Sequence, residues 1–142
     1  MEKVITISNQ LSISSKITDY AQLTKMRLAF LVVFSAAMAF LMGSGGDLNW
    51  GKFVLLILGG FLVTGSANAF NQIMEKDLDK LMDRTSMRPL PDMRMKSLEA
   101  LIVATAFGVI GLLILTIFMN PASGLLGLLA LLSYTIVYTP LK

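Results

Sequence analysis

Residues 98–119 read LEALIVATAFGVIGLLILTIFM and contain no charged residue after Glu99. The hydrocarbon core of a membrane is about 30 Å thick, and about 20 apolar residues in a helix are enough to cross it. Three other stretches have a comparable composition: about Leu28 to Met42, Phe53 to about Ala69, and Gly124 to Leu141. The sequence therefore predicts an all-α, polytopic membrane bundle with four transmembrane helices.

The composition supports this prediction and excludes several classes of enzyme. Hydrophobic residues make up 55% of the chain and charged residues 15%, whereas a soluble domain has about 25% charged residues. A helical bundle in water would need more polar surface than the four apolar runs leave. The sequence has no Cys and no His, which excludes within it a thiolate nucleophile, a Ser-His-Asp triad and a cysteine- or histidine-ligated metal.

The basic residues predict how the chain is oriented in the membrane. Of the 12 Lys and Arg residues, four precede the first span, six lie between the second and third spans, and one follows the fourth. The positive-inside rule places these three regions in the cytoplasm. We therefore expect a multi-pass protein of the cell (inner) membrane, surrounded by lipid, with the N-terminus and the 70–97 loop cytoplasmic. The net charge of +3 gives no reason to expect a nucleic-acid partner.

The first 20 residues are expected to form a polar N-terminal tail, and residues 21–142 the membrane domain. Residues 1–16 are polar and rich in Ser, which is typical of a frayed tail and not of a secretory signal. Thr18 or Asp19 is expected to cap a short interfacial helix that continues through Tyr20 and Leu23 into the first span.

Small and polar residues recur at four-residue spacing on the second and third spans. This spacing allows helix backbones to approach closely in a membrane, and it is seen at Gly60, Thr64 and Asn68 and at Ala100, Ala104 and Gly108. Asn68 is polar at membrane depth. It is interpreted either as an interhelical hydrogen bond or as a contact to an acceptor substrate.

Charged residues continue the second span beyond its apolar part. No Gly or Pro occurs in 68–83, so the helix is expected to reach Asp83. At i, i+4 spacing it would present an acidic line followed by a basic line: Asn71, Glu75, Asp79 and Asp83, then Lys76, Lys80, Arg84 and Arg88. One interpretation is a solvated charged extension of the helix. The other is a metal–diphosphate clamp, because amide and carboxylate oxygens suit Mg²⁺ and Arg binds phosphate oxygens.

The next residues, RTSMRPLP at 84–91, carry a resemblance to a known family. Pro89 and Pro91 are expected to stop the helix and impose an extended path, which keeps two arginines near the carboxylates. The pattern Asn71-x-x-x-Glu75-x-x-x-Asp79 followed by this segment resembles the first aspartate-rich motif of the intramembrane prenyltransferases. Within that superfamily, NQIMEKDLDKLMDRTSMRPLP is most similar to the protoheme IX farnesyltransferases, or heme O synthases. Residues 23–43 resemble the first span of that family, and YTPLK at 138–142 resembles the end of its fourth span.

The resemblance implies transfer of a farnesyl group from farnesyl diphosphate to a vinyl group of protoheme IX, giving heme O. By their match to the motif, Asn71, Glu75 and Asp79 would bind Mg²⁺ and serve in catalysis. Arg84 and Arg88 match positions that contact the diphosphate. Glu75 stands where many relatives have Asp, which keeps the charge and lengthens the reach.

The resemblance also assigns roles near the end of the chain. Tyr138 and Lys142 match a Tyr-x-x-x-Lys pair, in which the Tyr would contact substrate and the Lys would contact diphosphate. Without the resemblance, the two residues are equally well interpreted as a tyrosine at the membrane interface and a lysine that extends its ammonium group to the interface. Met26 departs from the family, which often has Pro at this position.

The extent of the resemblance sets further expectations. It covers the chain after about residue 20 but only about half of the family's length, which comprises about nine helices and a second aspartate-rich loop. We therefore expect the N-terminal half of such an enzyme, with the remaining half as a further partner. The alternatives are another intramembrane prenyltransferase acting on a quinone or chlorophyll precursor, and an inactive fragment or membrane scaffold. A small transporter fits poorly, because its ionisable residues would lie inside the bundle.

Overall fold

The computed structural model describes residues 1–138 and 141, with the backbone alone at residues 7–11 and 138. The described residues form helices joined by turns. In chain order the elements are α1 (Glu2–Leu23), α2 (Met26–Gly43), α3 (Trp50–Asp79), α4 (Ser97–Ile114), the π-helical η1 (Leu115–Met119), α5 (Pro121–Leu132) and the π-helical η2 (Ser133–Tyr138). The prediction of an all-α protein is confirmed.

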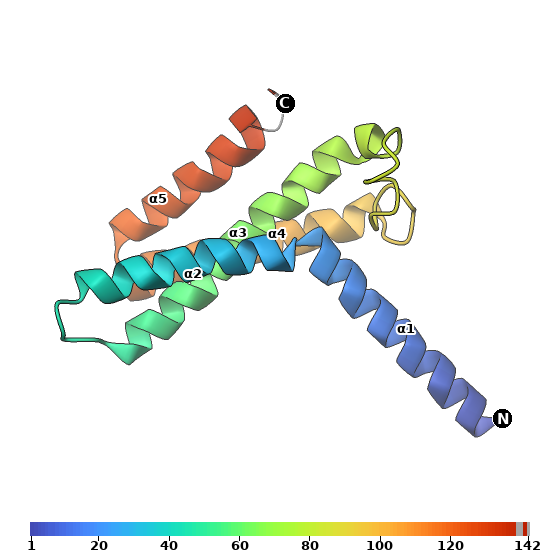
Figure 1. Ribbon diagram of the computed structural model, residues 1–142, viewed down its shortest axis with the longest axis horizontal. Coiled ribbons are helices and arrows are strands. Elements are labelled where there is room, and N and C mark those ends of the chain that lie inside the picture. The colour runs from blue at the N-terminus through green and yellow to red at the C-terminus, as the bar shows by residue number, and fades with distance from the viewer. Residues whose placement is uncertain (139–140, 142) are drawn as a thin grey trace.

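Three helical segments in the described part of the chain are long and apolar enough to cross a membrane: Met26–Gly43, Trp50–Asp79 and Ser97–Met119. Pro121–Val137 is a shorter apolar helix in the region of the fourth predicted span. Figure 1 shows the connection from α2 to α3 and the turn before α5 at one end of the bundle. The junction of α1 with α2 and the loop from α3 to α4 lie at the opposite end, so successive spans run in opposite directions.

Asparagine side chains cap the N-terminal ends of two helices. Asn49 Oδ1 accepts a hydrogen bond from the backbone N–H of Lys52 at 3.0 Å, at the start of α3. Asn120 Oδ1 accepts one from the N–H of Ser123 at 2.7 Å, at the start of α5. Each bond satisfies a backbone donor that has no partner within its helix. Pro121 occupies the first turn of α5, where a missing N–H costs nothing.

The most extensive contact in the fold joins α3 to α4. Ala100, Ala104 and Gly108 are buried on α4, and Ser66 Oγ donates to the carbonyl oxygen of Ala104 at 2.6 Å. Close packing of the third predicted span is therefore confirmed. On α3, Gly59 contacts α4 and η1, whereas Gly60 faces Val33 of α2.

The N-terminal residues differ from the predicted frayed tail. They form a helix, α1, that reaches Leu23 and extends away from the bundle (Figure 1). No Gly or Pro interrupts residues 2–23, and the C-terminal part of α1 is held by side-chain contacts to α4 and the loop before it. Thr18 donates to the carbonyl oxygen of Ser14 at 3.0 Å, within α1, so it is not an N-cap. Asp19 likewise caps nothing, because it is paired with Arg94.

Two amide side chains of α3 hold the junction between α1 and α2. α1 ends before Thr24 and Lys25, and Lys25 has a left-handed φ of 48°, so the helix does not continue into the first span as predicted. Asn68 Nδ2 donates to the carbonyl oxygen of Thr24 at 3.0 Å. Gln72 Nε2 donates to the carbonyl oxygens of Gln22 and Leu23 at 2.7 and 3.1 Å. These bonds add partners to carbonyl groups at the end of a helix, where the helix itself leaves carbonyls unsatisfied. The Gln22 carbonyl also accepts the N–H of Lys25 at 3.2 Å.

Candidate functional site

The site begins with the last turns of α3. Asn71, Glu75 and Asp79 lie on successive turns, and Asn71 Nδ2 donates to Glu75 Oε2 at 2.9 Å. α3 ends at Asp79, four residues before the predicted end, so Asp83 is not part of the acidic line on the helix. Thr85 explains the early end: it is buried, and its hydroxyl donates to the carbonyl oxygen of Asp79 at 3.0 Å. In a continuing helix the N–H of Asp83 would bind this oxygen.

The residues after α3 bring an arginine back to the acidic line. Arg88 Nη1 contacts Asp79 Oδ2 at 2.7 Å, and the Asp79 residue is only 4% exposed. The path is a series of turns and not the predicted extended segment: the N–H of Arg88 binds the Thr85 carbonyl at 3.1 Å, and the N–H of Met95 binds the Pro89 carbonyl at 3.1 Å. The prolines act as buried corners of these turns, because Pro89 and Pro91 are both buried. The prediction that an arginine lies close to the carboxylates is confirmed for Arg88.

A pocket of about 400 Å³ lies between the end of α3 and these turns. Its lining combines carboxylates, arginines and two apolar side chains: Glu75, Leu78, Asp79, Met82, Arg84, Thr85 and Arg88. A pocket lined by both arginines and carboxylates can bind an anion and a cation together.

The donor atoms of the site fit a hard cation that a ligand helps to coordinate. Among the described residues no three His, Cys, Asp or Glu side chains are grouped to hold a metal. Glu75 and Asp79 supply two carboxylates, and Asn71 supplies an amide one turn before them. Mg²⁺ is commonly held by one or two carboxylates, with waters and substrate phosphates as its other ligands. The residues therefore suit a cation that binds together with a phosphate compound.

Other residues predicted for the site have different positions. Asn68 is buried and bonded to the junction of α1 and α2, which agrees with the first of its two interpretations. Lys76 does not face the pocket, because its ammonium group donates to Ser97 Oγ at 2.9 Å. Lys142 and the side chain of Tyr138 lie outside the described residues, so their predicted roles stay predictions.

A second, apolar cavity of about 330 Å³ lies among α2, α3 and α5. It is lined mainly by aliphatic side chains, with Asn68, Thr64 and Tyr134 among its polar members. Asn68 and Asp79 are 11 positions apart on α3, which corresponds to about 16 Å along a helix axis. One helix thus connects the charged pocket to an apolar one.

Sequence reasoning missed the structural role of Thr85 and the contacts of Arg94. Thr85 was visible within the motif, but its burial depends on the turns that follow it. Arg94 contacts Asp19, which is 75 residues earlier in the chain. No periodic pattern relates residues that far apart, so spacing could not identify this pair.

Comparison with known proteins places the chain among membrane prenyltransferases. The model of the "UbiA prenyltransferase family" matches residues 32–142. A "Protoheme IX farnesyltransferase" of Christiangramia forsetii is 43% identical over 129 residues, which cover 91% of this chain and 42% of that protein. A protein of the same name from Flavobacterium johnsoniae is 40% identical over 136 residues, which cover 94% of this chain and 45% of that protein. Another, from Thermus thermophilus, is 37% identical over 121 residues, which cover 85% of this chain and 20% of that protein. The chain spans less than half the length of these relatives. No solved structure matches it.

Proposed function

The chain belongs to the UbiA prenyltransferase family, and from this premise we propose that it acts in farnesyl transfer from farnesyl diphosphate to protoheme IX, giving heme O. The observation that carries the proposal is the pocket in which Glu75 and Asp79 lie with Arg84 and Arg88. Its charges suit a diphosphate and the cation that accompanies it. The two substrates are taken from the names of the relatives above, because each is called a protoheme IX farnesyltransferase.

The arginines are assigned to the diphosphate. Asp79 holds the Arg88 guanidinium at the pocket through Nη1, and a guanidinium has five N–H donors. The other donors of Arg88 can therefore bind phosphate oxygens without breaking the ion pair. Arg84 is exposed on the same pocket and can approach the diphosphate from a second direction. Both arginines would stabilise the negative charge that the diphosphate gains as its bond to the farnesyl carbon breaks.

Mg²⁺ is the proposed cofactor, as is general in this family, and Asn71, Glu75 and Asp79 are the residues proposed to bind it. When bound, Mg²⁺ supplies positive charge that stabilises the departing diphosphate. The hydrogen bond from Asn71 to Glu75 orients both side chains. The burial of Asp79 strengthens the attraction of its carboxylate for a cation, because charges attract more strongly where the dielectric constant is low.

The chain is proposed to cross the membrane four times, with the helix Pro121–Val137 as the fourth span. Seventeen residues of helix are about 25 Å long, which is somewhat shorter than the membrane core. The apolar cavity lined by Val63, Ala67 and Leu131 is proposed to hold part of a prenyl chain, because it lies along α3 from the charged pocket. The positive-inside rule puts the loop between α3 and α4 in the cytoplasm.

A pair of matched variants tests the diphosphate pocket. Asp79→Asn removes a buried carboxylate of the pocket, whereas Asp77→Asn makes the same change at a side chain that is 80% exposed and pairs with Lys80. We expect Asp79→Asn to weaken Mg²⁺-dependent binding of farnesyl diphosphate at least tenfold, or about 1.4 kcal/mol. Asp77→Asn should bind as the unmodified chain does. Calorimetric titration in detergent, with Mg²⁺ and again with a chelator, measures both.

Equal Mg²⁺-dependent affinity in Asp79→Asn and the unmodified chain would overturn the assignment of this pocket. The acceptor is tested separately, in membranes that contain the protein together with the remaining half that the resemblance predicts. These membranes are supplied with farnesyl diphosphate and either protoheme IX or a hydroxybenzoate. Mass spectrometry should find a farnesylated product with protoheme IX. A farnesylated hydroxybenzoate would instead indicate an enzyme of quinone synthesis.

A further inference from the structure

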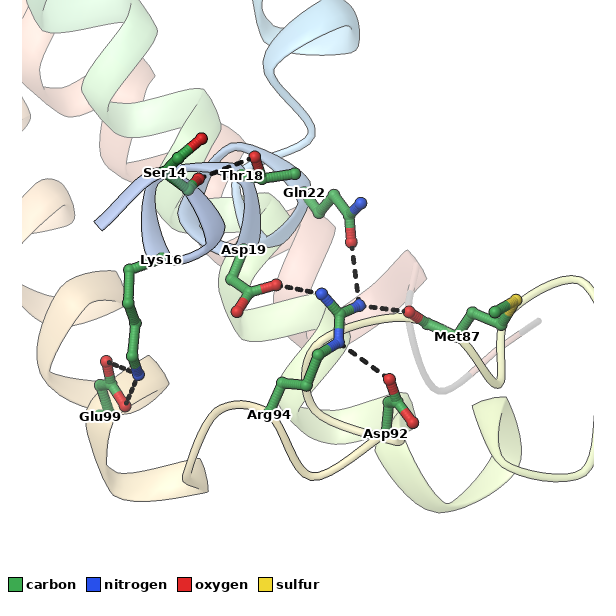
Figure 2. Close-up of polar contacts among 9 residues, drawn as sticks. All are labelled: Ser14, Lys16, Thr18, Asp19, Gln22, Met87, Asp92, Arg94 and Glu99. Atoms are coloured by element: carbon green, nitrogen blue, oxygen red, sulfur yellow. Dashed lines mark hydrogen bonds and ion pairs between the residues drawn. The ribbon is translucent and has the colours of Figure 1, made fainter. Parts of the chain in front are cut away.

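Arg94 joins two parts of the chain that are distant in sequence. Figure 2 shows its guanidinium surrounded by side chains of α1 and by residues of its own loop. Nη1 is paired with Asp19, Nε donates to Asp92 Oδ2 at 2.8 Å, and Nη2 donates to the carbonyl oxygen of Met87 at 2.6 Å. Nη2 also lies 3.4 Å from Gln22 Oε1. One side chain thus connects α1 to two points of the loop between α3 and α4.

The partner on α1 is deeply buried. Asp19 is 2% exposed, whereas the Arg94 side chain is 35% exposed. A carboxylate removed from water in this way requires a cation or several hydrogen bonds. The ion pair with Arg94 is therefore a fixed contact and unlike a surface pair that opens freely in water.

The contact with Met87 extends this connection to the diphosphate pocket. Met87 is followed directly by Arg88, which holds Asp79 at 2.7 Å, and by Pro89 and Leu90, which are buried. Leu90 packs in one apolar cluster with Leu23 at the end of α1. The turn that presents Arg88 is thus held from both sides, by Arg94 at the backbone of Met87 and by apolar packing after Arg88.

We propose that Arg94 is a positioning residue for prenyl transfer: by bonding Asp19 of α1 and the Met87 carbonyl together, it sets the position of Arg88 in the diphosphate pocket. This inference rests on the proposed function, and it gives α1 a task outside the membrane spans. Arg94 does not line the pocket, so it acts through the backbone of residues 87 and 88. Because Nη2 must reach the Met87 carbonyl while Nη1 reaches Asp19, a planar guanidinium is required and an ammonium group does not suffice.

A second polar link between α1 and the bundle serves as the control. Lys16 Nζ contacts Glu99 Oε1 of α4 at 3.3 Å, and the Tyr20 hydroxyl donates to the same oxygen at 2.5 Å. The hydrogen bond to this carboxylate, together with burial, raises the pKa of Tyr20 above its usual value. Tyr20 also packs against the apolar cluster that contains Leu90 and Met95 of the loop, whereas Lys16 contacts Glu99 of α4, so Lys16 is the control.

The experiment compares Arg94→Lys, Arg94→Gln and Lys16→Gln in the full chain in detergent. The Mg²⁺-dependent affinity for farnesyl diphosphate and the hydrogen exchange of residues 80–96 are measured for each. We expect both Arg94 variants to lose tenfold or more in affinity and to exchange faster in 80–96, with unchanged exchange in α2 to α4. Arg94→Lys keeps the positive charge, so its loss cannot come from weaker long-range attraction of the anion. Lys16→Gln should stay within twofold of the unmodified chain.

Three outcomes would overturn the inference. Unchanged affinity in both Arg94 variants would show that the loop is positioned without Arg94. Lost affinity with unchanged exchange in 80–96 would mean that Arg94 binds the diphosphate directly. An equal loss in Lys16→Gln would mean that any weakening of α1 has the same effect. A variant that loses exchange protection throughout α2 to α4 has unfolded, and its affinity is not used. If Arg94→Gln unfolds, the affinity and exchange of Arg94→Lys, which retains a cation for Asp19, decide whether the inference holds. Asp79→Asn is included because its failure to weaken binding refutes the proposed function, independently of Arg94.

Discussion

Asp79 shows how single residues assemble the site. Its side chain holds Arg88, and its carbonyl oxygen accepts the hydroxyl of Thr85 and the N–H of Met82 in place of the N–H of Asp83 that a continuing helix would supply. The same residue therefore ends α3 and fixes the first turn of the loop that returns an arginine to the helix. A hydroxyl can stop a helix in this way because it offers a buried carbonyl another partner.

Met93 is a residue whose backbone conformation can be tested. Its φ is 58°, in the left-handed region, and the residue is 82% exposed. A left-handed conformation costs a residue with a Cβ about 1–2 kcal/mol, and glycine avoids this cost. We expect Met93→Gly to be more stable than Met93→Ala by about 1 kcal/mol, measured as the apparent Tm in detergent. Both variants lose the exposed thioether, so their difference reflects the strain at the alanine Cβ less the larger backbone entropy that glycine loses on folding. A lower Tm for Met93→Gly would contradict a left-handed Met93.

At the scale of the element, α3 combines two functions that usually belong to separate segments. Its first part contains an apolar segment long enough to span a membrane, and its last three turns carry Asn71, Glu75 and Asp79. Asn68 and Gln72 lie where these parts meet and hold the end of α1. A shift or rotation of α3 would therefore move both pockets and the junction together. The packing of α3 against α4 therefore fixes the position of the site residues on α3.

Two glycines test this packing. A Cβ at Gly111 of α4 would lie 2.9 Å from the backbone nitrogen of Val63 in α3, whereas a Cβ at Gly60 would meet only Val33 Cγ2, at 3.7 Å. Backbone cannot move aside cheaply, so Gly111→Ala should destabilise the protein by about 1–3 kcal/mol. Gly60→Ala should be neutral or slightly stabilising, because alanine favours helix over glycine. Apparent Tm values in detergent compare them, and equal values would contradict the close approach of α3 and α4.

At the scale of the whole molecule, the spans alternate in direction, and the α1–α2 junction and the loop between α3 and α4 share one end (Figure 1). The charged pocket lies at this end, because the end of α3 and this loop line it. Most of the basic residues lie in the segments at this end, including Arg84, Arg88 and Arg94. The apolar cavity lies between the helices. A diphosphate in the charged pocket would therefore be near water, with an attached prenyl chain in the apolar interior.

Labelling of single cysteines tests the orientation, and the chain has no native Cys to interfere. Ser44→Cys lies in the turn after α2 and Ser86→Cys in the loop after α3, at opposite ends of the bundle. With the positive-inside orientation, Ser86→Cys should react with a membrane-impermeant reagent only from the cytoplasmic side and Ser44→Cys only from the other. Reaction of both from the same side would refute the alternating spans.

The sequence by itself determined the helical class, the approximate spans and the types of residue that gather at the candidate site. Long uncharged runs require helices in a membrane because every backbone group must be bonded within its own segment. The four-residue spacing of Asn71, Glu75 and Asp79 placed them on one helix face because that spacing is close to one helical turn. Both inferences depend on local geometry, and local geometry can be calculated from residue order.

Tertiary structure alone decided where α3 ends, how residues 80–95 turn, and what α1 contacts. Thr85 ends α3 and Arg94 reaches Asp19 because turns and burial bring these groups together. Spacing along the chain encodes neither contact. The helix at residues 2–23 was missed for a similar reason, since its C-terminal part is stabilised by Arg94 and Glu99, which lie far along the chain. Contacts between distant residues depend on the free energy of the whole packed arrangement, and periodicity in one segment cannot supply it.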